Sequence, residues 1–155
     1  MNVALALIPL PTVLSWTVMM INGNVDWKKT RLSFLQPPNW VFAVAWSIIY
    51  LLYGLFAYLA VVNEEPSLVW IMVVWCMNLA ANLLWTPVFT RERYTESAWL
   101  IVAMMGTLGA LFVLTDNKWG RLCIVPYTTW LVVALLLNYT IAGALNKNAP
   151  SVFER

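Results

Sequence analysis

The sequence contains no histidine and few charged residues. Nine of its 155 residues are Lys or Arg and seven are Asp or Glu, so that 10% are charged, against about 25% in an ordinary soluble domain. Without histidine the chain has no imidazole for acid–base catalysis or for binding a metal or haem iron. A net charge of +2 provides no basic field. We therefore expect no metal site and no nucleic-acid partner.

Cysteine is scarce too, and the common catalytic motifs are missing. Cys76 and Cys123 stand alone in apolar runs, which is typical of small hydrophobic side chains rather than of a disulfide or a zinc cluster. The sequence has no P-loop, no dinucleotide-binding fingerprint and no serine-nucleophile elbow. No ionisable residue lies deep in an apolar run, which argues against a proton-coupled transporter or an ion pump.

Apolar residues, by contrast, make up 62% of the chain. Five apolar stretches each have close to the roughly 20 residues that a helix needs to cross a bilayer. Because lipid cannot pair with backbone polar groups, each stretch should be helical. We expect an all-α fold, an integral membrane bundle of five transmembrane helices that forms a single domain over residues 1–155. The expected spans are residues 3–21, 39–62, 68–89, 97–115 and 120–145.

The first stretch has a second interpretation as a signal peptide. No basic segment precedes it and no small-residue cleavage site follows it, so we interpret it as a span. Pro9 and Pro11 should kink or locally unwind this helix, which membrane helices tolerate.

Basic residues are unevenly divided between the two sides of such a bundle. The positive-inside rule assigns the side richer in Lys and Arg to the cytoplasm. One side has two, Lys118 and Arg121, and the other has the remaining seven: Lys28, Lys29, Arg31, Arg91, Arg93, Lys147 and Arg155. We therefore expect the N-terminus outside and the C-terminus in the cytoplasm. A bacterial plasma membrane and a mitochondrial outer membrane are both compatible with this pattern.

The ten tryptophans fall into two groups. Trp27, Trp40, Trp70 and Trp119 lie near the ends of spans and are typical of anchors at the membrane interface. Several of the other tryptophans share one face of a helix with further aromatic or polar residues. In the third span, one face contains Trp75, Asn78, Asn82, Trp85 and Phe89.

That face should point into the bundle, because carboxamides are costly in contact with lipid. Two interpretations of Asn78 and Asn82 stay open: hydrogen bonds between helices, or polar anchors in an aromatic cavity. Similar stripes, that is, rows of residues along one helix face, occur in two other spans. They are Trp46, Tyr50, Tyr53 and Ala57 in the second span, and Tyr127, Trp130, Ala134, Leu137 and Asn138 in the fifth. Their polar tips favour a cavity for a flat, apolar ligand. The fourth span has a face that permits close helix approach, with Trp99, Ala103, Gly106 and Ala110.

Three motifs recur in a familiar order along nearly the whole chain. They are Pro37-Pro38-Asn39-Trp40-Val41-Phe42 followed by Ala45-Trp46, then Asn78-x-x-x-Asn82-x-x-Trp85-x-Pro87-x-Phe89, and finally Pro126-Tyr127-x-x-Trp130 with Asn138-Tyr139. Together they resemble the TspO/MBR family, the tryptophan-rich sensory proteins and translocator proteins, also known as peripheral-type benzodiazepine receptors.

The resemblance implies a five-helix bundle, often dimeric, with a pocket beneath the first loop. The implied ligands are porphyrins such as protoporphyrin IX, isoquinoline and benzodiazepine drugs and, in animal members, cholesterol. The ligand-binding residues expected from the stripes and the resemblance together are Trp46, Tyr50, Asn82, Trp85, Trp99, Tyr127, Trp130, Ala134, Leu137 and Asn138. Trp46 and Trp130 match the two positions implicated in light-dependent porphyrin breakdown.

The leading hypothesis is a membrane receptor that binds porphyrins and would thereby sense or regulate tetrapyrrole levels. One alternative is an enzyme that degrades porphyrin in light, with Trp46 and Trp130 as its catalytic residues. Others are a transporter of tetrapyrroles or cholesterol-like lipids, and a structural pigment-protein subunit. We expect no cofactor, porphyrin as the ligand, and membrane lipid and a second copy of the chain as partners.

Overall fold

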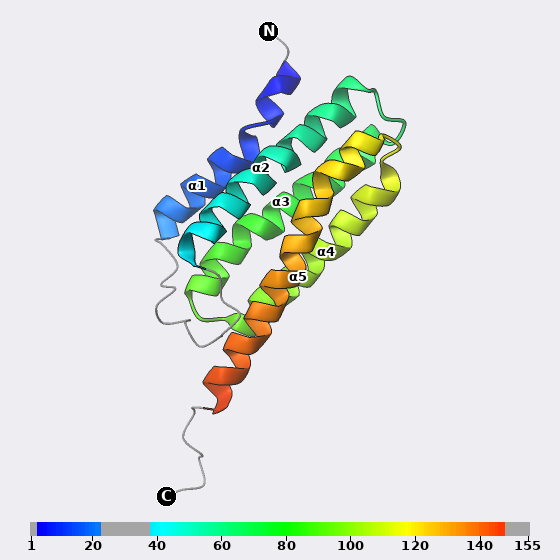
Figure 1. Ribbon diagram of the computed structural model, residues 1–155. Coiled ribbons are helices and arrows are strands. Elements are labelled where there is room, and N and C mark those ends of the chain that lie inside the picture. Colours follow the sequence, from blue (N-terminus) through cyan, green and yellow to red (C-terminus); the bar gives the residue numbers. More distant parts are fainter. Residues whose placement is uncertain (1–2, 23–37, 148–155) are drawn as a thin grey trace, which may run out of the picture.

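The computed structural model describes residues 3–22 and 38–147, and within these ranges it contains helices and connections but no strand. A short 3-10 helix, η1 (Val3–Leu7), precedes α1 (Leu10–Asn22), α2 (Asn39–Val62), α3 (Leu68–Thr90), α4 (Tyr94–Leu114) and α5 (Lys118–Lys147). The helices run side by side in one bundle, and the start of η1 and the end of α5 lie at opposite ends of it (Figure 1).

Five segments are long and apolar enough to cross a membrane, with η1 and α1 forming one of them. The all-α, five-span prediction is therefore confirmed. The fourth and fifth helices begin earlier than expected, at Tyr94 and Lys118. A cap explains the start of the fifth helix, because Asn117 Oδ1 accepts a hydrogen bond from the Trp119 N–H at 2.8 Å. At the start of the fourth helix, Arg93 and Glu96 form an exposed ion pair at 3.0 Å.

The first span is interrupted at Ile8 and Pro9, as its prolines predict. The helix resumes with a hydrogen bond from the Val13 N–H to the Pro9 carbonyl, 3.0 Å long. The break lies directly against Gly54 of α2, where a Cβ atom would overlap the Ile8 carbonyl oxygen. Glycine thus permits the backbones of the first and second spans to touch.

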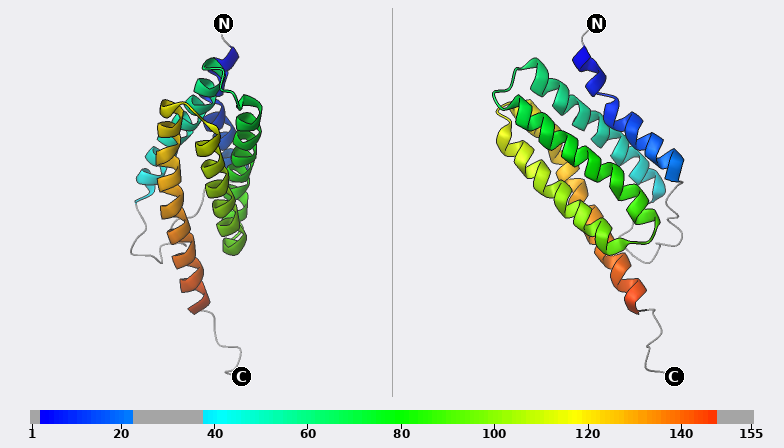
Figure 2. Two further views of the ribbon diagram at one scale, coloured as in Figure 1. Left: turned by 90° about the vertical axis from the view of Figure 1, so that its right-hand side faces the viewer. Right: turned by 180° about the vertical axis from the view of Figure 1, so that it is seen from behind.

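The helices form a closed ring. α2 packs on α5, α5 on α4 and α4 on α3, and α1 completes the ring against α2 and α3. Figure 2 shows α5 beside α4 and α1 beside α2. α3 and α5 do not pack on each other through their backbones. Side chains from α2, α3, α4 and α5 together fill the middle of the ring.

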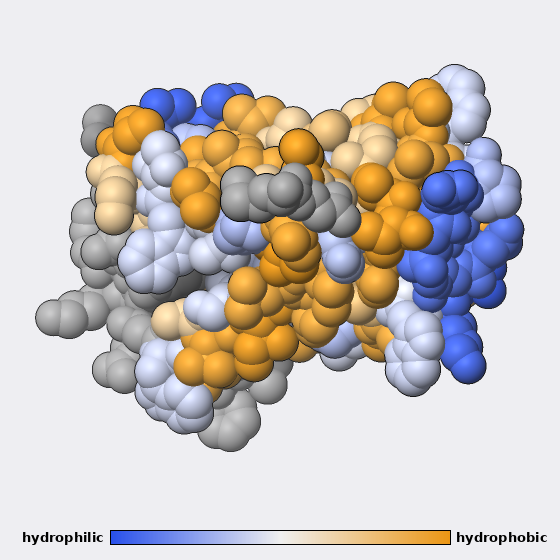
Figure 3. Space-filling model, turned by 90° about the horizontal axis from the view of Figure 1, so that it is seen from above, coloured by the Kyte–Doolittle hydropathy of each residue, from blue (hydrophilic) through white to orange (hydrophobic). Residues whose placement is uncertain are grey.

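At one end of the bundle, a single carboxylate joins the connection between α2 and α3 to the connection between α4 and α5. Glu65, between α2 and α3, is only 5% exposed. Its two carboxylate oxygens accept hydrogen bonds from the backbone N–H groups of Asp116 and Asn117, between α4 and α5, at 3.0 and 2.9 Å. Viewed from this end, hydrophilic residues gather on one side of the molecule and apolar residues cover much of the rest (Figure 3).

Tryptophans expected at the membrane interface are exposed near helix ends. Trp40, Trp70 and Trp119 are 67%, 66% and 61% exposed, whereas Trp27 lies outside the described residues. Both cysteines are free thiols, but Cys76 is exposed and only Cys123 is buried. Cys76 lies on the outer side of α3, so only Cys123 packs inside the bundle as a small hydrophobic side chain.

The small-residue face of α4 points away from the ring. Trp99, Ala103 and Gly106 are exposed, and a Cβ at Gly106 would meet nothing within 4 Å. The face of α4 that packs inside contains Ser97, Ile101, Met104, Leu108 and Leu111. The close helix approach expected for the small-residue face does not occur within the described chain, because larger residues on the opposite side form the contact.

Candidate functional site

The polar face of α3 points into the bundle, as its spacing predicts. Asn78 is 0% and Asn82 4% exposed. Asn78 Nδ2 donates to the Met104 carbonyl at 3.0 Å and to Thr107 Oγ1 at 2.7 Å, both on α4. This carboxamide therefore joins two helices, the first of the two interpretations left open by the sequence.

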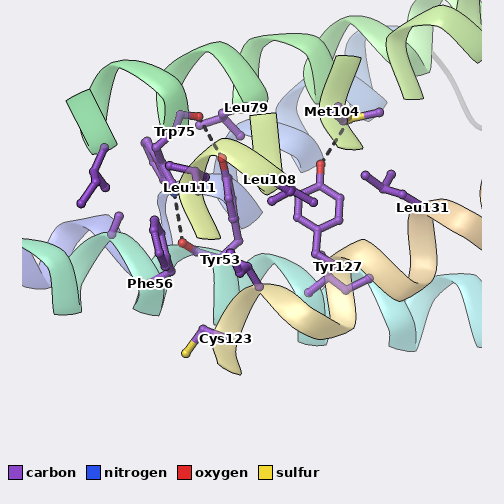
Figure 4. Close-up of a cluster of buried hydrophobic side chains, with 14 of the residues drawn as sticks. Tyr53, Phe56, Trp75, Leu79, Met104, Leu108, Leu111, Cys123, Tyr127 and Leu131 are labelled. Atoms are coloured by element: carbon purple, nitrogen blue, oxygen red, sulfur yellow. Dashed lines mark hydrogen bonds between the residues drawn. The ribbon is translucent and has the colours of Figure 1, made fainter. Parts of the chain in front are cut away.

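Asn82 is the centre of a hydrogen-bonded chain that crosses four helices. The Tyr50 hydroxyl donates to Asn82 Oδ1 at 3.0 Å, and Asn82 Nδ2 donates to the Tyr127 hydroxyl oxygen at 2.7 Å. The Tyr127 hydroxyl donates in turn to Met104 Sδ at 3.2 Å (Figure 4). Each group has a partner, so the network fixes Tyr50 and Tyr127 without exposing a polar atom to lipid.

A cavity lies beside this network, between α2, α3 and α5. It contains about 380 Å³ of empty space, counting the part open to its surroundings. Its lining is aromatic and aliphatic apart from one carboxamide: Phe42, Trp46, Trp85, Phe89, Trp130, Ala134, Leu137, Asn138 and Ile141. Phe42 and Phe89 place it near the start of α2 and the end of α3. Whether the loop of residues 23–37 covers it, as the resemblance implies, lies outside the described residues.

Trp46 is the centre of the aromatic wall. Its ring stacks on Tyr50 with centroids 5.1 Å apart, and its edge contacts are to Tyr127 at 5.9 Å and Trp130 at 6.4 Å. Phe42 meets Trp130 edge-on at 5.5 Å. Since Tyr50 and Tyr127 are both held by Asn82, the hydrogen-bonded chain fixes the rings behind Trp46.

Two polar atoms of residues that line the cavity have no hydrogen-bond partner among the described residues. They are Trp85 Nε1, a donor, and Asn138 Oδ1, an acceptor, and both are buried. Trp85 stacks on Phe89 with centroids 4.7 Å apart. Buried polar groups are nearly always paired, so a donor and an acceptor in this lining are left to pair with water or with another polar group.

The structure gathers six of the ten predicted ligand-binding residues around the cavity: Trp46, Trp85, Trp130, Ala134, Leu137 and Asn138. Tyr50, Asn82 and Tyr127 lie behind them as support. Trp99 does not join them, because it is 69% exposed on the outer side of α4.

Three cavity residues are absent from the predicted set. Phe42 and Phe89 belong to the motifs on α2 and α3, and Ile141 comes one turn after Leu137 on α5. Extending the stripe of α5 by four residues would have included Ile141.

Comparison with known sequences identifies the family. The sequence model of the TspO/MBR family matches residues 4–143. The chain belongs to the TspO/MBR family. The match begins within η1 and continues through most of α5, and so includes every residue of the cavity.

Similarity to individual TspO/MBR proteins supports the same family assignment. The chain is 34% identical to a tryptophan-rich sensory protein of Cereibacter sphaeroides, over 74% of this chain and 73% of the relative. It is 32% identical to Protein CrtK of Rhodobacter capsulatus, over 68% and 69%. The translocator protein of Ovis aries is 29% identical over 67% and 65%. With its five apolar helices, this TspO/MBR chain is a multi-pass membrane protein.

Proposed function

We propose that the protein is a membrane receptor that binds porphyrins or similarly flat hydrophobic ligands in the cavity between α2, α3 and α5. The observation that carries this proposal is the pair formed by Trp46 and Trp130. They come from different helices, line one cavity, and lie 6.4 Å apart nearly at right angles. Such a corner of two indoles provides one ring face for stacking and one edge for contact with a flat ligand.

Burial of apolar area supplies most of the expected affinity. Each Å² of apolar surface removed from water contributes about 25 cal/mol, and an aromatic pair adds about 0.5–1.5 kcal/mol. A ligand that leaves water or the membrane interface for this cavity gains both the free energy of apolar burial and that of the aromatic contacts. Asn138 and Trp85 then orient it through hydrogen bonds.

The size of the cavity limits how a porphyrin can bind. The enclosed part of the cavity has room for about one water molecule, far less than the roughly 300–1,000 Å³ typical of small-molecule sites. A complete substituted macrocycle therefore needs the cavity to widen. α3 and α5 meet across it only through side chains, so rotation of Trp85 or Trp130 provides the least costly way.

Fluorescence titration tests this function. Protoporphyrin IX added to the purified full chain should quench tryptophan emission to saturation. A Trp46→Phe, Trp130→Phe double variant should lose most of the saturable component. A Trp70→Phe, Trp119→Phe variant is the matched control, because both of its indoles are exposed at helix ends. Equal saturable quenching in the two double variants would contradict the proposed site.

Light-dependent degradation of the bound porphyrin is a second candidate, favoured by the same two indoles. Trp46 and Trp130 are readily oxidised side chains on the wall that the ligand would touch. Under illumination, the complex should then lose porphyrin absorbance faster than the free pigment in the same detergent. Equal rates would leave binding as the function.

The expected partners and orientation complete the proposal. Membrane lipid surrounds the bundle, a second copy of the chain forms a homodimer, and the N-terminus lies outside with the C-terminus in the cytoplasm. Two separate C-terminal fusions, one to a periplasmic phosphatase and one to a fluorescent protein, test the membrane orientation of the chain in a bacterial host. Only the fluorescent fusion should be active, and the reverse result would contradict the assignment.

A further inference from the structure

Two basic side chains lie at the end of the bundle opposite the cavity. Lys118 and Arg121 are one turn apart at the start of α5 and therefore share one face of it. Among the described residues they are the only Lys or Arg at this end, because Arg91 and Arg93 lie between α3 and α4 and Lys147 ends α5 (Figure 1).

No carboxylate neutralises either cation within the described chain. The one ion pair of that part of the chain lies at the other end, at the start of α4. Glu65, the buried carboxylate at this end, accepts from backbone N–H groups between α4 and α5 instead. Glu64 and Asp116 are exposed and pair with neither Lys118 nor Arg121. Both cations can therefore bind an anion from outside the chain.

Two contacts orient the guanidinium of Arg121. Its Nε donates to the Thr115 carbonyl at 2.7 Å, and its central carbon lies 5.4 Å from the centre of the Phe112 ring. A guanidinium has five N–H donors, so the four on its terminal nitrogens have no acceptor among the described residues. Terminal nitrogens held in this way form a fork that can bind a phosphate through two hydrogen bonds.

Lys118 is oriented by the indole next to it. Its Nζ lies 5.3 Å from the centre of the Trp119 ring, and the side chains of both residues are exposed. Exposed tryptophan at the end of a span is typical of the membrane interface, which is also the level of the lipid phosphates. The two cations thus lie where an anionic lipid would present its headgroup.

An apolar stripe continues along α5 from the two cations toward the middle of the membrane. Its residues share the face of Lys118 and Arg121 and are exposed on the outer side of the bundle: Leu122, Val125, Val132 and Leu136. On α4, Gly109 lies one turn from Phe112, and a Cβ there would meet nothing within 4 Å. The surface next to the cations is therefore apolar and has open space for an acyl chain.

We propose that Lys118 and Arg121 bind the phosphate of an anionic phospholipid, whose acyl chains lie along the stripe of α5. The terminal nitrogens of Arg121 and the Lys118 ammonium donate to the phosphate oxygens. A zwitterionic lipid has the same phosphate but brings an ammonium group close to two cations, so it binds more weakly. The site lies at the other end of the bundle from the cavity and does not depend on the proposed receptor function.

Native mass spectrometry of the full chain, released from detergent micelles, tests this site. The protein is mixed with equal amounts of phosphatidylglycerol and phosphatidylcholine that have identical acyl chains. We expect phosphatidylglycerol to be retained about tenfold more, the ratio of one hydrogen bond to a charged group. A Lys118→Gln, Arg121→Gln double variant should retain the two lipids equally.

An Arg91→Gln, Arg93→Gln variant is the matched control. It loses the same two positive charges at the other end of the bundle and should keep the preference for phosphatidylglycerol. Equal loss of the preference in both double variants would show that it follows net charge alone and would overturn the site. Equal retention of the two lipids by the unaltered chain would overturn it as well.

Two further measurements complete the test. If the change at Arg121 prevents folding because its bond to Thr115 is lost, Lys118→Gln decides, since Lys118 has no hydrogen bond to a described side chain. That variant should have a lower preference, and an unchanged preference would contradict the proposal. Inorganic phosphate at constant ionic strength should leave phosphatidylglycerol bound, whereas displacement would indicate a site for free anions and overturn the lipid assignment. Quenching by protoporphyrin IX should be the same in every variant, so failure of this proposal leaves the cavity's function untouched.

Discussion

Tyr53 of α2 and Trp75 of α3 exchange hydrogen bonds across the bundle core. The Tyr53 hydroxyl donates to the Trp75 carbonyl at 2.9 Å, and the Trp75 indole N–H donates to the Tyr53 carbonyl at 3.1 Å (Figure 4). Their rings stack between these bonds, with centroids 5.3 Å apart. The pair joins α2 to α3 near the middle of the bundle, so that the cavity can occupy the end of the same two helices.

Removing one of these bonds should have a measurable effect on stability. Tyr53→Phe keeps the ring stack but loses the hydroxyl, and the melting temperature in detergent should fall by the equivalent of about 0.6 kcal/mol, the average for such bonds in membranes. Tyr53→Leu also loses the stack and should fall further, by about 0.5–1.5 kcal/mol. Tyr139→Phe is the control, since Tyr139 is 79% exposed. Identical melting of Tyr53→Phe and Tyr139→Phe would rule out a contribution from the bond.

The contact between the first two spans depends on Gly54. In Gly54→Ala the new methyl group would overlap the Ile8 carbonyl oxygen and lie 2.6 Å from that of Leu7. These are backbone atoms, so no side-chain rotation relieves the overlap, and we expect a loss of about 1–3 kcal/mol. Gly106→Ala is matched to it, with open space around the new methyl, and should be neutral or stabilising by up to about 1 kcal/mol. Equal melting temperatures would contradict the close approach.

Glu65 should stabilise the connections at the end opposite the cavity. Glu65→Ala leaves the N–H groups of Asp116 and Asn117 without their acceptor, at a cost of about 1–3 kcal/mol for each group that water does not reach. Glu65→Gln keeps one acceptor oxygen and should lose about half as much. The neighbouring Glu64 is exposed, so Glu64→Gln should melt like the unaltered protein. A Glu65→Ala variant as stable as Glu64→Gln would show that the carboxylate is dispensable.

Sequence patterns predicted much of this fold because the physics behind them is local. Span length follows from bilayer thickness, and the spacing of Asn78 and Asn82 placed both amides on the inward face of α3. Pro9 predicted the break in the first span. Each of these features depends on residues within a few turns of one another.

Features that depend on distant contacts were not predictable. Spacing could not tell whether Asn82 binds a ligand or joins helices, because its partners Tyr50 and Tyr127 come from two other helices. The outward position of Trp99 depends on how α4 rotates against α3 and α5. The role of Glu65 depends on a connection about 50 residues later, so nothing in its local sequence indicates it.

The central claim, that a flat ligand binds between Trp46, Trp85 and Trp130, is tested most directly by fluorine NMR of protein labelled with 5-fluorotryptophan. Single Trp→Phe variants assign the ten resonances. On titration with protoporphyrin IX, the resonances of Trp46, Trp85 and Trp130 should shift and saturate together, while those of Trp70 and Trp119 stay unchanged. Saturable shifts confined to Trp70, Trp119 and the other exposed indoles would place the ligand on the outer surface and contradict the account.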